Sequence, residues 1–329
     1  MKNTVKTLLE NKDKTVPILS FPSTQLLGIS VRELISDSEN QAKGMRAVAD
    51  RANIGASLNM MDLSVEAEAF GAEVLFCDDE IPTVTKGVLE DIEDAENLKV
   101  PEVGSARTGI YIDGVRKAKE IVKDLPVFCG VIGPYSLAGR LFDMTELMMS
   151  CFDDPDGVHC LLEKATNFLI EYIKAFKEVG ADGVIMAEPA AGLLSPDLFA
   201  EFSNPYVKRI IDETSDNNFV FGYHNCGNVV ALADDIASLG ADIYHFGNAV
   251  ELSDMLPHFP DDVIVMGNID PVMFKTSTPD KIREETKRVY NSCKDYDNFM
   301  LSSGCDIPAD SKWENLDSYF EAVRECYGK

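Results

Sequence analysis

No stretch of this chain stays apolar for long. No segment approaches the ~20 apolar residues that a membrane span needs, and the first 23 residues contain no apolar run as long as that of a signal peptide. We therefore expect a cytoplasmic protein without a segment that crosses or binds a membrane.

Basic residues are scarce as well. The chain has 30 lysines and arginines against 56 aspartates and glutamates, which gives a net charge of −26. A field of this sign repels phosphate backbones and anionic lipid surfaces, so we expect neither nucleic acid nor a membrane among the partners. The acidic surface could dock a basic patch on a partner protein, and solubility alone is the simpler explanation.

Closely spaced cysteine pairs are missing. The eight cysteines are spread over the whole chain, and none of them forms a Cys-x-x-Cys motif. Such spacing in a large chain is typical of reduced thiols or metal ligands and not of a disulfide framework.

The chain does contain enough apolar material for a large core, with 45% hydrophobic and 26% charged residues. From about residue 125, short β-branched or aromatic runs alternate with helical patterns, which indicates parallel strands joined by helical crossovers. The expected strands are Val127–Val131, Gly183–Ala187, Phe219–His224, Ile243–His245, Val263–Met266 and Phe299–Ser302. Between and after them, helices are expected at Val158–Val179, Val229–Leu239, Pro279–Cys293 and Trp313–Tyr327.

The first 120 residues are less regular. Ile18–Phe21 and Ser57–Met61 are candidate strands, whereas Val31–Ala52 and Thr108–Lys123 have helical patterns. No Ser/Gly-rich linker and no internal repeat divides the chain. We therefore predict an α/β fold of the (β/α)8 TIM type, formed by a single domain over residues 1–329, with an N-terminal helical elaboration.

Three potential metal ligands follow predicted strands. His224 and Cys226 stand at the end of one strand, and residues two apart on an extended chain point to the same side. Cys305 lies just past the last predicted strand, and the carboxyl ends of parallel barrel strands surround one mouth. Glycine stands beside both cysteines, at Gly227 and Gly304, where the backbone must come close to something. The pattern predicts that the three side chains converge on one rim.

One imidazole and two thiolates suit zinc, and three protein ligands leave the fourth tetrahedral position open, as in catalytic zinc sites. A thiol bound to zinc would be a thiolate at neutral pH, whereas a free thiol with a pKa of ~8.5 is mostly protonated. Two protein thiolates donate charge to the metal and should keep a bound substrate sulfur nucleophilic. Taken alone, the pattern also fits a buried pair of structural cysteines beside a core histidine.

Other polar residues are expected at the same mouth. Glu188 follows the predicted strand Gly183–Ala187 and could accept a thiol proton or orient a ligand, or it could be a solvated rim carboxylate. Tyr135 and Ser136 are candidate substrate contacts in the tight loop Gly133–Gly139, which lacks the lysine and the spacing of a phosphate-binding loop.

Asn268 and Asp270 close another predicted strand and are also candidate substrate contacts. A turn that ends at Pro271 would use the same two residue types for hydrogen bonds to its own backbone. Both interpretations are compatible with the sequence.

Five motifs occur in an order that resembles a known family: Gly133–Gly139, Glu188–Pro196, His224-x-Cys226-Gly227, Gly267–Pro271 and Gly304–Pro308. They resemble the uroporphyrinogen decarboxylase superfamily. More narrowly, they are similar to its zinc-dependent branch, the methylcobamide:thiol methyltransferases, which accept a methyl group from a corrinoid protein. The similarity covers most of the chain, including Leu27–Ser30 and Val65–Glu73. By this resemblance, His224, Cys226 and Cys305 match the zinc ligands of that branch.

The chain departs from the family pattern in two places. Decarboxylases carry an arginine-rich motif for the substrate carboxylates, which should fall near Val16–Ser23, and this segment has no arginine. A ring with many carboxylates needs cationic partners, because burying those charges unpaired is prohibitive. Some methyltransferases supply a carboxylate after the next strand, whereas Ile243–Asn248 has none. It offers His245 instead, as a fourth, displaceable ligand or as a hydrogen-bond partner of a ligand or substrate.

The resemblance implies an enzyme in which zinc activates a small thiol such as coenzyme M. The thiolate would attack the methyl group of a Co(III) corrinoid held by a separate corrinoid protein, leaving Co(I). Another thiol or a folate as acceptor is equally compatible with these residues. Two alternatives stay open: a metal-free decarboxylase of a porphyrinogen or another carboxylated ring, and a non-catalytic module that binds a corrinoid protein or holds zinc.

Overall fold

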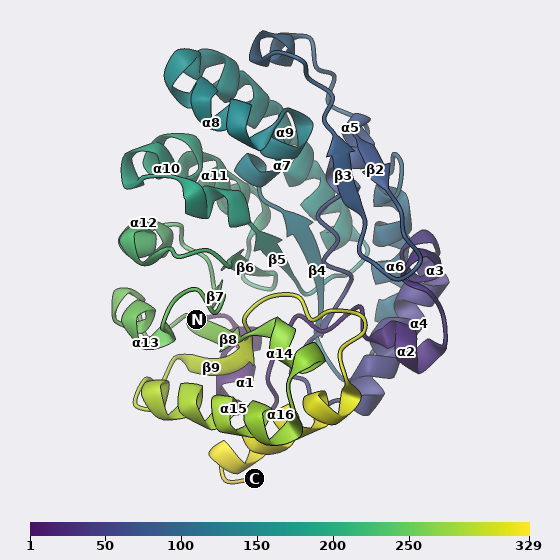
Figure 1. The fold of residues 1–329 in the computed structure, drawn as a ribbon, viewed down its shortest axis with the longest axis vertical. Coiled ribbons are helices and arrows are strands. Elements are labelled where there is room, and N and C mark those ends of the chain that lie inside the picture. The colour runs from purple at the N-terminus through teal and green to yellow at the C-terminus, as the bar shows by residue number, and fades with distance from the viewer.

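The computed structural model describes residues 1–329, and its centre is a curled sheet of seven parallel strands (Figure 1). The strands follow each other in the sheet as β1 (Ser57–Leu58), β4 (Val127–Ile132), β5 (Gly183–Ala187), β6 (Val220–Asn225), β7 (Ile243–Phe246), β8 (Ile264–Ile269) and β9 (Phe299–Ser303). Two further strands, β2 (Glu73–Leu75) and β3 (Thr83–Lys86), form a separate antiparallel pair.

Helices surround the sheet (Figure 1). They are α1 (Asn3–Glu10), α2 (Ser23–Leu27), α3 (Val31–Ser36), α4 (Ser38–Arg51), α5 (Val65–Phe70), α6 (Thr108–Ile121), α7 (Pro134–Leu141), α8 (Met144–Asp153), α9 (Pro155–Glu178), α10 (Pro196–Phe202), α11 (Asn204–Thr214), α12 (Ala233–Ala237), α13 (Leu252–Met255), α14 (Pro271–Thr276), α15 (Pro279–Cys293) and α16 (Trp313–Cys326). None of these helices is long and apolar enough to cross a membrane.

The central strands are buried along their whole length. Every residue of β4, β5 and β8 is buried, for example. Strands that are covered by helices on one side and by the barrel core on the other have continuous apolar sequences. These strands could therefore be predicted from the sequence pattern. All six strands predicted after residue 125 are present, and the predicted α/β fold of the TIM type with N-terminal helices is confirmed.

The sheet has seven regular strands and not eight, because Ile18–Phe21 is not a strand. The extended segment around it nevertheless occupies the eighth position, between β1 and β9. Thr15 pairs with Ile54 on the β1 side. On the β9 side, Ile18 donates its backbone N–H to Ser303 Oγ at 3.0 Å. Pro17 has no N–H to give to a ladder, so side chains replace the regular backbone bonds.

Three other predicted elements are shorter than expected. Val31–Ala52 is two helices, because Asp37 ends α3 and its side chain accepts a hydrogen bond from Asn40 N at the start of α4. Ser57–Met61 is a strand only over β1, since the Asn59 side chain takes the next ladder position and accepts from Gly130 N at 2.7 Å. Val229–Leu239 contains only a 3-10 turn and the short α12.

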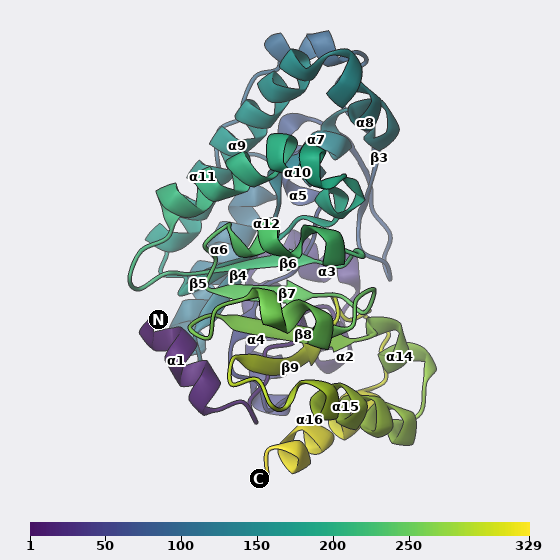
Figure 2. The same cartoon turned by 90° about the vertical axis from the view of Figure 1, so that its left-hand side faces the viewer.

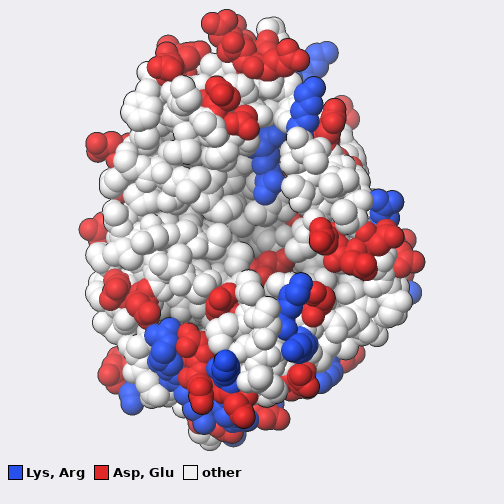
Figure 3. All heavy atoms as spheres, in the orientation of Figure 1, with Lys and Arg blue, Asp and Glu red and all other residues white.

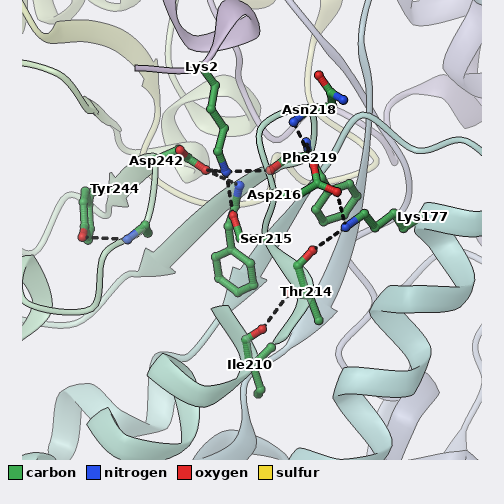
Figure 4. Close-up of polar contacts among 12 residues, drawn as sticks. Lys2, Lys177, Ile210, Thr214, Ser215, Asp216, Asn218, Phe219, Asp242 and Tyr244 are labelled. Atoms are coloured by element: carbon green, nitrogen blue, oxygen red, sulfur yellow. Dashed lines mark hydrogen bonds and ion pairs between the residues drawn. The ribbon is translucent and has the colours of Figure 1, made fainter. Parts of the chain in front are cut away.

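The helix α1 closes the amino-terminal end of the barrel. Val5 and Leu8 pack into a core cluster with barrel residues such as Ile185 and Val220. Figure 4 shows how Lys2 fixes this helix: its Nζ lies 2.7 Å from Asp242 Oδ2 and 2.8 Å from the Phe219 carbonyl oxygen, at the starts of β7 and β6. In Figure 2 the strands run across the view with α1 at one end and α14 at the other. The carboxyl ends of the strands therefore form the opposite, open end of the barrel, here called the mouth.

Candidate metal centre

His224, Cys226 and Cys305 come together at the mouth. His224 lies near the end of β6, Cys226 follows that strand, and Cys305 lies two residues past β9. Two strands separate β6 from β9 in the sheet, so the curvature of the barrel brings the ligands together. The potential ligand atoms of all three residues lie within 4.8 Å of one another. The predicted convergence on one rim is thus present in the structure.

The geometry of this group fits a zinc ion. His224 Nε2 lies 3.5 Å from Cys305 Sγ. A tetrahedral zinc with bonds of ~2.3 Å to sulfur and ~2.0 Å to nitrogen would place two such ligand atoms about 3.5 Å apart. His224 is buried, whereas both cysteines are partly exposed. The group therefore has an open side toward the mouth, where a fourth ligand could bind.

His245 is fully buried behind His224 and is not one of the three grouped residues. Its Nε2 lies 2.6 Å from the carbonyl oxygen of Ser303, and its Nδ1 lies 2.7 Å from His224 Nδ1. A carbonyl only accepts, so His245 carries its proton on Nε2 and accepts at Nδ1. His224 must then donate from Nδ1. This chain of hydrogen bonds leaves the lone pair of His224 Nε2 facing the two thiols.

The two thiols are strongly coupled. Hydrogen bonding between the two thiols lowers the pKa of Cys226 below its ordinary value. A lowered pKa favours the thiolate, which is the form that binds metals.

Cys226 is held by residues that its motif alone did not identify. The Asn225 side chain accepts from Gly227 N at 2.8 Å and donates to the Glu188 carbonyl at 2.6 Å, which fixes the turn that contains Cys226. On the other side, a Cβ at Gly247 would lie 2.6 Å from Cys226 Cα, so only glycine fits there. The predicted close approach at Gly304 is also present, because a Cβ there would lie 3.0 Å from the Asn248 backbone nitrogen.

Glu188 is fully buried and is not a solvated rim carboxylate. Its Oε1 accepts from Ser136 N at 2.9 Å at the start of α7, and its Oε2 has no partner. Burial raises the pKa of Glu188 to about 8, so the carboxyl is mostly protonated at neutral pH. Its backbone N–H donates to the His224 carbonyl at 2.9 Å, which places it directly beside the metal centre's strand.

Of the four residues predicted to contact substrate, only some lie at the cavity in the mouth. Ser136 borders a cavity at the mouth, and its Oγ accepts from Ala190 N at 3.0 Å. Tyr135 is fully buried, with its hydroxyl 3.7 Å from Cys151 Sγ in the helical layer, so the structure does not bring it to that cavity. Asn268 donates to two carbonyls of the loop after β7, and Asp270 accepts from Val272 N as the cap of α14.

Several charged residues near the mouth were not singled out from the sequence. Asp306 follows Cys305, and burial raises its pKa well above the ordinary value, while neither carboxylate oxygen has a hydrogen-bond partner. Asp62 pairs with Arg107 in a buried network. Arg140 directly follows the motif Gly133–Gly139, and that adjacency was the one signal in the sequence that could have identified it.

The mouth is hollowed at its centre (Figure 3). A cavity of about 340 Å³ lies between α7, β3 and the turn after β5, and Lys86, Ser136, Arg140 and Ala190 are among its lining residues. In Figure 3, basic atoms lie at the upper edge of the hollow, acidic atoms lie at its lower edge and toward the periphery, and much of the surface beside it is uncharged.

A TIM-type barrel with a His-Cys-Cys group at its mouth defines the class of this protein, and comparison with known proteins places it in a family. Residues 17–326 match the uroporphyrinogen decarboxylase (URO-D) family, and the chain belongs to that family. The resemblance predicted from the five motifs is thereby confirmed.

Similar proteins include both activities of the family. A methylcobamide:CoM methyltransferase of Methanosarcina acetivorans is 28% identical over 268 residues, which cover 80% of this chain and 77% of the relative. A uroporphyrinogen decarboxylase of Ruthia magnifica is 25% identical over 287 residues, covering 84% and 82%. The solved structure of a methyltransferase from Methanosarcina mazei superposes with a TM-score of 0.87 at 23% identity, covering 99% of this chain and 100% of that one, and so shares the fold.

Proposed function

We propose that this protein is a zinc-dependent methyltransferase that moves a methyl group from a methyl-corrinoid to a small thiol such as coenzyme M. The observation that carries the proposal is the group of three ligand atoms within 4.8 Å at the open end of the barrel. The similarity to a methylcobamide:CoM methyltransferase supports the same reaction. Zinc, when bound there, would act as a Lewis acid that holds the acceptor sulfur as a thiolate at neutral pH.

The residues of the chain have distinct roles in this proposal. His224, Cys226 and Cys305 hold the metal and leave one side open to the mouth. His245 keeps the His224 lone pair directed at it through the hydrogen bond between the two rings. Glu188, neutral at rest, orients the start of α7 and the His224 strand. Ser136, Asn268 and Asp270 shape the rim.

The methyl-corrinoid is proposed to arrive on a separate corrinoid protein in the cytoplasm. Cys226 and Cys305 are partly exposed at the mouth, so the corrinoid would present its methyl group there. The hollow with uncharged surface beside it suits a partner that seats a large cofactor face (Figure 3). The chemistry itself then needs only the thiolate and a labile methyl group on cobalt.

A decarboxylase reaction is less well supported. The segment Val16–Ser23, where the family's arginine motif was expected, has no arginine, and Val16 and Ile18 are tied to β9 by side-chain hydrogen bonds. Of the cations near the mouth, Arg107 is already paired with Asp62 and Glu68. A substrate with many carboxylates would therefore be left with unpaired buried charges.

The deciding experiment measures zinc by mass spectrometry in protein purified without added metal. We expect about one zinc per chain in the natural protein, and its loss in both Cys226→Ser and Cys305→Ser. Cys160→Ser, a partly buried cysteine of α9 outside the site, is the matched control and should retain the metal. The loaded protein should then demethylate methylcobalamin with 2-mercaptoethanesulfonate, and a chelator should stop the reaction.

Two results would contradict the proposal. Freshly reduced protein without zinc would remove its basis and favour a metal-free decarboxylase. Zinc-loaded protein that fails to demethylate methylcobalamin with any of the thiols tested would favour a non-catalytic module that holds zinc or binds a corrinoid protein.

A further inference from the structure

Arg140 is an unpaired cation in the wall of the mouth. Most arginines of the chain form ion pairs, and Arg107, for example, forms two. Arg140 lies in the last turn of α7, is half-buried, and takes part in no ion pair and no side-chain hydrogen bond. It lines the cavity of about 340 Å³ together with Lys86, an exposed lysine that also has no ion-pair partner.

The acidic groups near Arg140 form no ion pair with it, and Asp143 in the same cavity wall caps α8 by accepting hydrogen bonds from Thr145 N and Glu146 N. Asp62 already accepts hydrogen bonds from Arg107 and from Tyr111. Glu66 is fully buried, and that burial raises its pKa to about 7, so about half of its carboxyls are neutral near pH 7. Burial also lowers the pKa of Arg140, which means that the charged guanidinium is poorly solvated where it lies. A partly desolvated cation without a partner is unfavourable unless an anion joins it.

The cavity is connected to the metal centre by direct contacts. Ser136, in its wall, donates its backbone N–H to Glu188 Oε1 at 2.9 Å. Glu188 in turn donates its backbone N–H to the His224 carbonyl at 2.9 Å. In the sheet, β5 alone separates β4, which leads into α7, from β6. Arg140 is thus linked to the His224 strand through α7, Ser136 and Glu188, at the same end of the barrel.

We propose that Arg140, assisted by Lys86, is the residue that binds the anionic group of the acceptor thiol. This inference rests on the proposed function for the position of the sulfur. The planar guanidinium presents two parallel N–H donors to a sulfonate, carboxylate or phosphate. With the oxyanion at Arg140 and the sulfur at the metal centre, the acceptor is oriented from both ends. The net charge of −26 elsewhere disfavours non-specific binding of the same anions.

Binding is tested without turnover, using 2-(methylthio)ethanesulfonate, which has the anion but no free thiol. Calorimetry should show binding to the natural protein and a dissociation constant raised about tenfold or more in Arg140→Ala, the range expected for loss of charge-assisted hydrogen bonds. Arg140→Lys should recover part of the affinity. Arg324→Ala removes an arginine of α16 that also lacks an ion pair, and it should bind like the natural protein.

The kinetic test compares 2-mercaptoethanesulfonate with the neutral 2-mercaptoethanol, with methylcobalamin as donor. In Arg140→Ala, the KM for the anionic thiol should rise about tenfold or more. The KM for the neutral thiol should stay within about twofold of its value in the natural protein. Replacing methylcobalamin by methylcobinamide, which lacks the phosphodiester of the nucleotide loop, distinguishes the other source of an oxyanion. If Arg140 binds the acceptor, the effect of its substitution is the same with both donors.

The inference is overturned if the natural protein does not bind the thioether, if Arg140→Ala affects both thiols equally, or if its effect vanishes with methylcobinamide. These failures are distinct from failure of the proposed function. Thioether binding that depends on Arg140, in a protein without methyl transfer, would retain the anion site and reject the reaction. Methyl transfer that does not change in the Arg140 variants would retain the proposed reaction and reject the anion site. Unchanged thermal unfolding of Arg140→Lys checks that the fold is intact.

Discussion

His245 has no free ring nitrogen, because one faces the Ser303 carbonyl and the other faces His224. A role in orienting His224 therefore fits the geometry better than a role as fourth ligand. Such hydrogen bonds to a metal-binding histidine typically contribute 10- to 100-fold in affinity, as an order of magnitude.

We predict that His245→Ala weakens zinc binding by about 10- to 100-fold, measured by competition with a chromogenic chelator. His245→Asn places an acceptor oxygen near the position of Nδ1 and should restore most of the affinity. Equal zinc affinity in His245→Ala and the natural protein would show that the hydrogen bond between the two rings does not matter for the metal.

A second prediction at this scale concerns Glu66, which is fully buried and accepts from Ile132 N at 3.0 Å. Burial raises its pKa from 4.5 to about 7 in the folded chain. The folded state thus binds more protons than the unfolded state between these values, so its contribution to the free energy of unfolding decreases as pH rises from ~4.5 to ~7. The total change corresponds to about 3 kcal/mol.

Glu66→Gln cannot titrate and should show a flatter dependence of the free energy of unfolding on pH in this window, measured by urea denaturation at pH 5, 6 and 7. Glu284→Gln changes an exposed glutamate of α15 and should keep the slope of the natural protein. An identical slope in Glu66→Gln would mean that its carboxyl titrates normally in the folded chain.

At the scale of elements, the segment Thr15–Ser20 closes the barrel without being a strand. Thr15 donates its hydroxyl to the Leu301 carbonyl and lies 3.0 Å from the Tyr319 hydroxyl, all of them buried. Thr15→Val keeps the shape but leaves these groups unpaired. We predict a loss of about 1–3 kcal/mol in the free energy of unfolding. Thr7→Val, on the exposed face of α1, should change it by less than about 0.5 kcal/mol, and an equal loss in both would contradict this account of the closure.

Elements whose residues are buried on both sides could be predicted from the sequence, and so could the convergence of His224, Cys226 and Cys305, because strand ends position side chains directly. The closure at Thr15–Ser20 could not, since its hydrogen bonds come from side chains far along the chain. Arg140 was missed for a related reason. Nothing local shows that a helical arginine lacks an ion-pair partner, which depends on Asp62 and Glu66 in another segment.

At the scale of the whole molecule, charged residues are unevenly distributed over the face that contains the mouth (Figure 3). Acidic groups dominate the net charge of −26, yet the mouth contains an unpaired arginine and a largely uncharged surface (Figure 3). One unpaired arginine, with one lysine, matches a substrate with one anionic group better than a ring with many carboxylates. The uncharged surface is then free for a partner that covers the mouth.

A substitution at Leu193 can test whether a partner covers this surface of the mouth. It ends the turn that follows β5, the same turn that supplies Pro189 and Ala190 to the cavity wall, and its side chain is 60% exposed. A partner that brings a corrinoid to the metal centre must cover this part of the mouth, whereas free methylcobalamin need not contact it. A buried charge there would be left unpaired.

We therefore predict that Leu193→Asp raises the KM for a methylated corrinoid protein about tenfold or more, while kcat/KM for free methylcobalamin stays within about twofold. Ile121→Asp provides the matched control, because Ile121 is 43% exposed at the end of α6, on the side of the barrel where β4 begins. It should leave both values unchanged. An equal loss with free and protein-bound corrinoid would place Leu193 in the cofactor's path and not under the partner, and no loss with either would move the docking surface away from this side of the mouth.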